Sequence, residues 1–123
     1  MVGLSSYGEA AVLSPLTTTA YVSLHTSDPG NSGTSEVGSG VGYTRMGPVA
    51  FTNTPSNPTV AANTAIVTYP AGTGSWGTVT HFGVWDAATA GNYRGSGALT
   101  TPKAVGNGDT ARFSVGALTI TVD

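Results

Sequence analysis

The chain has 123 residues, enough for one domain with its own core, and its formal net charge at pH 7 is −2. Only 8% of the residues are charged, against roughly 25% in an ordinary soluble domain, and the four basic residues are scattered. This composition excludes the basic footprint of a nucleic-acid-binding protein, and a hydrophobic fraction of 39% argues against disorder.

Hydroxyl-bearing and small residues replace the missing charges, with twenty Thr, twelve Ser and eighteen Gly. A surface of this kind is poorly protected against association, so we expect contacts with other copies or other proteins. The absence of cysteine excludes disulfides and thiolate metal sites. No apolar run approaches the roughly eighteen residues of a membrane span, and the N-terminus has no signal-peptide pattern, so we expect no membrane partner.

The first fifteen residues contain the one segment that favours a helix. Ser6 and Glu9 have the spacing of a capping box, and Pro15 would end the helix. We therefore predict a short helical N-terminal arm over residues 1–16 and a separate β-domain over residues 17–123.

After the arm, the pattern is that of short strands. Residues 20–27 alternate Val22 and Leu24 with polar positions, which is the period of a strand. A long Gly- and Ser-rich loop is predicted over 28–42 and a polar loop over 52–59. The other predicted strands cover 43–51, 65–71, 77–87, 93–100, 111–116 and 117–123.

The segment 105–110 holds Asn-Gly between extended residues, which predicts a hairpin. Seven or eight strands separated by turn signals indicate one all-β domain, an antiparallel β-sandwich of jelly-roll-like form. In strand 77–87, Phe82 and Val84 would face the core, while His81 and Trp85 would share the second face.

Gly72, Gly74 and Gly77 match a dinucleotide-binding fingerprint, but a strand follows them where that site needs a helix. A glycine-rich turn that lets Trp76 fold back on the sheet explains them better. We expect no cofactor.

An acid–base pair of His81 and Asp86 is disfavoured because strand alternation puts them on opposite faces. Ser75 and Ser96 lack the sharp-turn motif of an activated serine. His25 and Asp28 have no further ligand at metal-binding spacing, so we expect no metal site. The sequence therefore predicts no catalytic residue and no enzyme.

The stretches "YVSLHTSDPG", "EVGSGVGYTR", "ANTAIVTYPAGTGSWGTVTHFGVWDAATAGN" and "GALTTPKAVGNGDTARF", with a terminal "ALTITVD", resemble a family of small structural proteins of tailed bacteriophages. Its members include tail-fibre-like, head-fibre and capsid-decoration proteins. The resemblance covers about residues 4–123 and implies assembly without catalysis. It also implies a capsid decoration (cement) protein that is made in the host cytoplasm and located on the capsid surface of the virion.

The expected partners are the protein itself, as a homotrimer, and the major capsid protein. The candidate interface lies partly in the arm, which is too short to form its own core, and partly on the second face of strand 77–87. Its residues are Leu4, Tyr7, Val12, Leu13, Leu16, His81 and Trp85.

Two alternatives remain open. One is a phage tail, fibre-attachment or host-receptor protein that uses loops 28–42 and 52–63 at one end of the sandwich for recognition. The other is a sugar-binding module, in which exposed Trp and Tyr side chains would stack on a glycan.

Overall fold

The computed structural model describes residues 20–54 and 59–122, and these residues form eight strands and no helix. The strands are β1 (Tyr21–His25), β2 (Phe51–Thr54), β3 (Thr59–Asn63), β4 (Val67–Thr68), β5 (Gly77–Trp85), β6 (Tyr93–Val105), β7 (Arg112–Phe113) and β8 (Thr119–Val122). All the pairings are antiparallel, so the predicted all-β antiparallel class is confirmed. The predicted helical arm lies outside the described residues.

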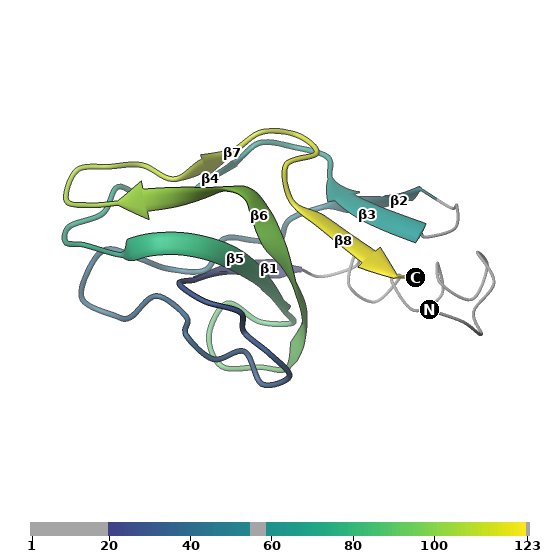
Figure 1. Cartoon of the computed structure of the whole chain (residues 1–123), viewed down its shortest axis with the longest axis horizontal. Helices are drawn as coiled ribbons and strands as arrows, with labels where there is room; N and C mark the ends of the chain where they lie inside the picture. The colour runs from purple at the N-terminus through teal and green to yellow at the C-terminus, as the bar shows by residue number, and fades with distance from the viewer. Residues whose placement is uncertain (1–19, 55–58, 123) are drawn as a thin grey trace.

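Three sheets result, with strand orders β1-β5-β6, β2-β3-β8 and β4-β7. Figure 1 shows β2, β3 and β8 to one side of the other strands, at the end where the C-terminus lies. The outer edge of β1 is not left open, because Val22 exchanges backbone hydrogen bonds with Met46 and Leu24 accepts one from Val37. Covering an edge in this way removes a site of unwanted strand pairing.

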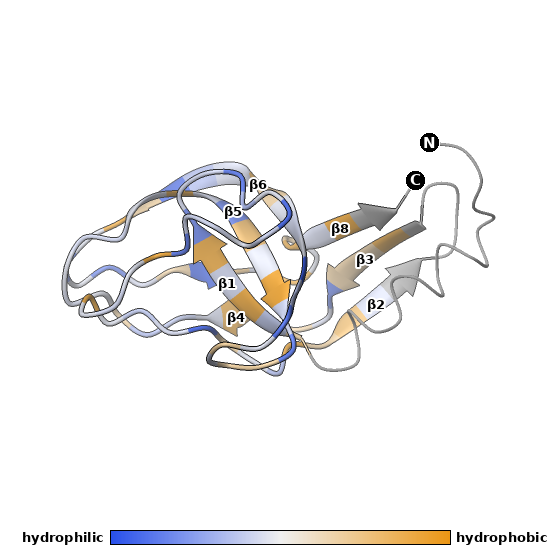
Figure 2. Cartoon of the chain, turned by 90° about the horizontal axis from the view of Figure 1, so that it is seen from below, coloured by the Kyte–Doolittle hydropathy of each residue, from blue (hydrophilic) through white to orange (hydrophobic). Residues whose placement is uncertain are grey.

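Alternate side chains of β1 and β5 point into the core. Val22 and Leu24 of β1 lie opposite Val84 and Phe82 of β5, and all four side chains are fully buried. Figure 2 shows the apolar and polar positions alternating along β1. Because side chains of a strand alternate between faces, these residues fill the interior and leave the next positions for the second face.

Aromatic side chains close the core on the side of sheet β4-β7. Tyr69 is 1% exposed, meets the rings of Trp76 and Phe113 edge to face, and donates a hydrogen bond to the carbonyl of Val22. Tyr43 stacks on Tyr69 at a ring distance of 6.3 Å. Buried aromatic pairs of this geometry contribute about 0.5–1.5 kcal/mol beyond the area they bury.

Several predictions of local structure are wrong. The predicted polar loop 52–59 and the recognition loop 52–63 contain β2 and β3, whose partners are each other and β8. Propensity did not reveal this, since strand pairing with a distant segment overrides a polar sequence. The predicted strand 43–51 is also wrong: Met46 forms an isolated bridge with Val22, and only Phe51 belongs to a strand, β2. Other strands differ in length, since β4 and β7 are shorter than the predicted 65–71 and 111–116, and β6 extends past residue 100.

The turn in segment 105–110 is confirmed, but the hairpin is not. The Asp109 N–H donates to the Gly106 carbonyl, and Gly108 has a φ of 87°. The flanking strands nevertheless join different sheets, β6 with β5 and β7 with β4. The turn therefore carries the chain from one sheet to another.

The close approach at Gly97 of β6 generates a testable prediction. A Cβ at Gly97 would lie 2.6 Å from both a ring carbon of Phe82 and the Thr119 carbonyl oxygen. Gly97→Ala should therefore lower the free energy of unfolding by about 1–3 kcal/mol, as overpacking does. Gly95 of the same strand has nothing within 4 Å of a Cβ. Gly95→Ala should be neutral or stabilising, and equal urea midpoints for the two variants would contradict the packing.

Candidate functional site

The second face of sheet β1-β5-β6 carries the two strand residues of the predicted interface. His81 lies opposite His25, and Trp85 lies opposite Tyr21. Phe82, between them, is fully buried on the core side. The prediction that Phe82 and Val84 face the core while His81 and Trp85 lie on the second face is therefore confirmed.

The chain's own loop covers part of this face. His25 and Ser23 are fully buried, because the segment after β1 returns over them and forms a bridge between His25 and Glu36. His81 and Trp85 are half-buried. A neighbouring subunit would reach only the parts of His81 and Trp85 that this loop leaves exposed.

A directed chain of hydrogen bonds runs beneath the loop. His25 Nδ1 lies 2.7 Å from the Thr34 carbonyl oxygen, which can only accept, so Nδ1 carries the proton. Nε2 of a neutral His25 then accepts from the Ser23 hydroxyl, 2.6 Å away. Ser23 Oγ in turn accepts from Trp85 Nε1 at 2.8 Å. A protonated His25 would leave the Ser23 proton without this acceptor.

The surroundings agree with a neutral ring. Burial lowers the pKa of His25 below its ordinary value of 6.5, and it outweighs the opposing effects of the Thr34 hydrogen bond and the Glu36 charge. The charges of Arg45 and His81 act in the same direction as burial. Ser23 and His25 resemble a nucleophile and its base, but both are fully buried and thus closed to a substrate.

Glu36 and Arg45 form an ion pair with two parallel bonds, Nε to Oε2 and Nη2 to Oε1, each 2.9 Å long. The Tyr43 hydroxyl donates to the same carboxylate at 2.6 Å. Burial alone would raise the pKa of Glu36, but the hydrogen bonds from Arg45 and Tyr43 outweigh it and lower this pKa. Burial and the bond to Glu36 raise the pKa of Tyr43, which keeps the phenol a donor.

Arg45 also ties two further segments together. Its guanidinium lies 3.7 Å from the ring centre of Trp85, a cation–π contact. Its Nη1 donates to the carbonyls of Ala87 and Ala90 in the turn after β5. One side chain thus joins the loop, the second face of the sheet and the β5–β6 turn.

The acid–base pair considered from the sequence is not assembled. The Asp86 carboxylate accepts from the backbone and side chain of Asn92, and these bonds lower the pKa of Asp86. His81 Nδ1 lies 2.8 Å from the Thr80 hydroxyl. Asp28, the other acidic candidate, accepts a hydrogen bond from the Gly30 N–H.

The serine candidates lie apart from one another. Ser75 accepts from the Gly77 N–H in the turn before β5, and Ser96 sits opposite Gly83 in β6. The glycine fingerprint leads directly into β5, so the helix that a dinucleotide site needs is missing at this position.

Trp76 and Tyr69 are buried, at 3% and 1% exposure, and cannot stack on a sugar. Trp76 Nε1 donates to the Val41 carbonyl at 2.7 Å, which fastens the Gly-rich loop to the core. Trp85 and Tyr93, with ring centres 5.3 Å apart, are the half-buried aromatic pair on the loop side.

The arm candidates, Leu4, Tyr7, Val12, Leu13 and Leu16, lie outside the described residues, so the interface stays a prediction. Within residues 20–54 and 59–122, no three His, Asp or Glu side chains gather as a metal site would require. The same part of the chain contains no helix long and apolar enough to span a bilayer.

Ser23, Glu36 and Arg45 were not predicted from the sequence. One signal was available, since Glu36 and Arg45 are two of only ten charged residues and stand in neighbouring segments rich in Gly. Their pairing follows from the path of the loop, which composition does not specify.

Comparison with known proteins gives one family. The family model described as "Podophage GP4 fiber I protein gp80" matches residues 6–121, which is nearly the whole chain. This agrees with the resemblance to small structural proteins of tailed phages. No curated protein matches the sequence.

The neutral His25 predicts a pH dependence of stability. Because its pKa is lowered in the folded state, the unfolded chain binds more protons, so stability present above about pH 6.5 should be lost as the pH falls below it. The slope for one proton is at most about 1.4 kcal/mol per pH unit. Urea unfolding between neutral and mildly acidic pH measures this loss. His25→Gln should flatten the profile, and a wild-type slope in this variant would contradict the assignment.

The ion pair gives a second prediction. Glu36→Gln keeps the shape but leaves Arg45, whose side chain is 9% exposed, without its counter-charge. We expect a loss of about 3 kcal/mol, at the low end for a broken buried pair because Glu36 retains some exposure. Asp109→Asn is the matched control, since its carboxylate is exposed and accepts one turn hydrogen bond. Thermal or urea unfolding should show a much smaller loss for Asp109→Asn, and similar losses would refute a special role for the pair.

Proposed function

The chain belongs to the phage fibre family described as "Podophage GP4 fiber I protein gp80", and we propose that within the virion it is a capsid decoration protein that bridges neighbouring capsid subunits. Membership of this family makes the chain a structural component of the virion. Its location on the capsid surface and its cementing role are the proposal.

The observation that carries the proposal is how the chain uses its charges. Its buried ion pair, Glu36 with Arg45, holds the chain's own loop, and most of the exposed positions among the described residues are Ser, Thr, Gly or Ala. Such a surface suits broad, close contacts with other protein surfaces. The family match and the separation of His81 from Asp86 both argue against an enzyme.

In this proposal the copies assemble as trimers at local three-fold positions and bind the major capsid protein. The N-terminal arm, residues 1–16, docks on the capsid or exchanges between neighbours through Leu4, Tyr7, Val12, Leu13 and Leu16. His81 and Trp85 add the exposed part of the second face to these contacts. A jelly-roll-like sandwich with a helical arm is the architecture that we propose for the whole chain.

A fibre or fibre-attachment protein is the second candidate, and the name of the family favours it. In this role the Gly-rich loop 28–42, most of which is exposed, would face a receptor. The half-buried pair of Trp85 and Tyr93 would be the place for a glycan.

Purified virions of the encoding phage test these roles. Immunogold labelling should place the protein over the head surface, and particles lacking it should release DNA at lower temperature than complete particles. Labelling of filaments, with unchanged heat resistance of the head, would establish the fibre role and overturn the cement proposal.

Add-back to particles that lack the protein tests the arm. Replacing Leu4, Tyr7, Val12, Leu13 and Leu16 by Ser keeps the chain length and should abolish binding. His25→Gln, whose change lies under the loop, should bind once folded. Undiminished binding of the five-Ser variant would show that the arm is not the docking element.

A further inference from the structure

Backbone contacts fix the junction between the arm and the β-domain. Ala20, where the described chain begins, is fully buried, and its carbonyl accepts a hydrogen bond of 2.7 Å from the Val49 N–H. The backbone also packs closely here, since a Cβ at Gly47 would lie 2.7 Å from the same carbonyl oxygen. The chain that precedes Ala20 is therefore attached directly beside residues 47–49.

Residues 46–50 also form one wall of an apolar groove of about 470 Å³, and residues 65–68 form the other wall. None of these residues is charged, and the side chain of Ile66 is 51% exposed. The buried amide of Asn63 holds the second wall, because its Nδ2 donates to the Ala65 carbonyl at 2.8 Å. The groove is thus preformed, and its volume lies within the ~300–1,000 Å³ that is typical of binding pockets.

The arm carries leucines at positions from which they can reach this groove. Leu16 stands four residues before Ala20, and Leu13 stands seven residues before it. An extended chain spans at most about 3.6 Å per residue, so Leu16 and Leu13 can lie up to ~14 and ~25 Å from Ala20. Because Ala20 is bonded to Val49 in the first wall, both leucines can enter the groove without any change in the β-domain.

We propose that Leu13 and Leu16, which we call the arm base, pack into the groove of their own β-domain. This contact is independent of the capsid role. It also divides the arm into two parts, and the task of the outer part rests on the proposed function: with the base held in the groove, Leu4, Tyr7 and Val12 remain for contacts with the capsid or with a neighbouring copy.

Covalent attachment selects the arm base as the occupant over a second copy or another virion protein. A short flexible tether gives a segment an effective concentration in the range of about 1 mM at a site that it can span. A separate protein would have to lose its translational and rotational freedom to bind in the same groove. Burial of the two leucines also removes the apolar surface of Ile66 from water.

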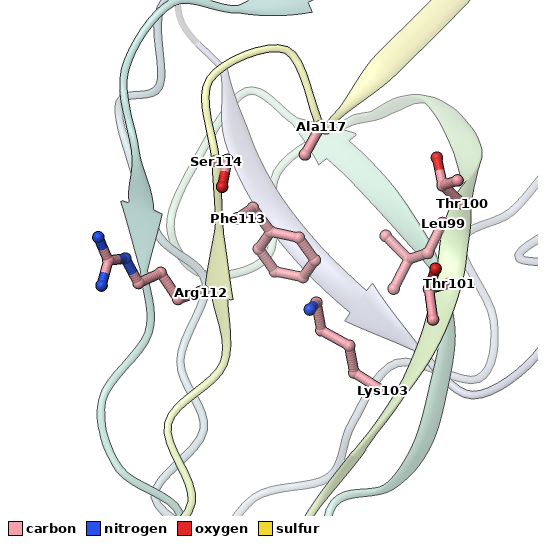
Figure 3. A pocket seen from close by; sticks show the side chains of 8 residues that line it. All are labelled: Leu99, Thr100, Thr101, Lys103, Arg112, Phe113, Ser114 and Ala117. Carbon is pink, nitrogen blue, oxygen red and sulfur yellow. The ribbon is translucent and has the colours of Figure 1, made fainter.

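A second groove, between β6 and β7, has a different chemistry (Figure 3). Lys103 and Arg112 line it, and Lys103 Nζ lies 5.4 Å from the ring centre of Phe113. A leucine packed there would remove water from two cations without giving them a hydrogen bond, which costs free energy. The uncharged groove is therefore the one that suits the arm base.

A pair of introduced cysteines tests the contact, because the chain has no cysteine of its own. Leu16→Cys combined with Ile66→Cys in the full chain should form a disulfide within one molecule under mild oxidation. Leu16→Cys combined with Asn107→Cys should stay reduced, since residue 107 is exposed in the turn after β6, at the opposite end of the molecule from β2 and β3 (Figure 1). Disulfide-linked dimers of the first pair would place the arm in a neighbour's groove and overturn the proposal, and so would a first pair that stays reduced.

A double-mutant cycle measures the same contact without a cross-link. Leu16→Ala and Ile66→Ala should each lower the urea midpoint of unfolding, and the double variant should lose less than the sum of both, because each change removes the same contact. Leu4→Ala, in the outer part of the arm, is the matched control, and its effect should add to that of Ile66→Ala. Additive losses for positions 16 and 66 would contradict the packing.

Binding to particles that lack the protein separates this contact from the capsid role. If the disulfide between positions 16 and 66 forms but the wild type does not bind particles, the arm base lies in the groove and the capsid role is wrong. If the wild type binds particles but this disulfide does not form, the capsid role stands and the groove contact is wrong.

Discussion

The loop side of the molecule depends on the guanidinium of Arg45. It forms a two-bond ion pair with Glu36, lies over the ring of Trp85 and donates to the turn after β5. Because the contact points come from the loop, the sheet and the turn, none of these segments can move without breaking bonds of a largely buried charge. In a chain with only ten charged residues, this ion pair orders the long irregular segment between β1 and β2.

Two other buried polar side chains also connect segments that are distant in the sequence. His25 connects the loop to the sheet through Thr34 and Ser23, and Asn63 connects two distant turns. The hydrogen-bonding groups of both side chains have fixed partners. Alternative packings would leave one of these buried groups unpaired and are therefore unfavourable. Short strands such as β4 and β7, with two residues each, do little by themselves to fix one arrangement of the chain.

The periodic patterns in the sequence predicted the features that depend on residues close together in the chain. The alternation around Phe82 placed the core and the second face correctly, and the burial of Trp76 followed from the glycine-rich turn before β5. Pairing between distant segments was not predictable. Segment 52–59 reads as a polar loop, but it contains most of β2 and the first residue of β3, because β2 pairs with β3 and β3 pairs with β8. The Asn-Gly turn reads as a hairpin although its two flanking strands bond elsewhere.

The uncharged lining of the groove at residues 46–50 and 65–68 has a consequence for a particle that passes between environments. Contacts that depend on opposite charges weaken as the salt concentration rises, since mobile ions screen them within about 10 Å at 0.1 M. Contacts built from apolar surface gain slightly, if anything, in salts that are excluded from protein surfaces. Any protein contact made through this groove would therefore depend little on the salt concentration.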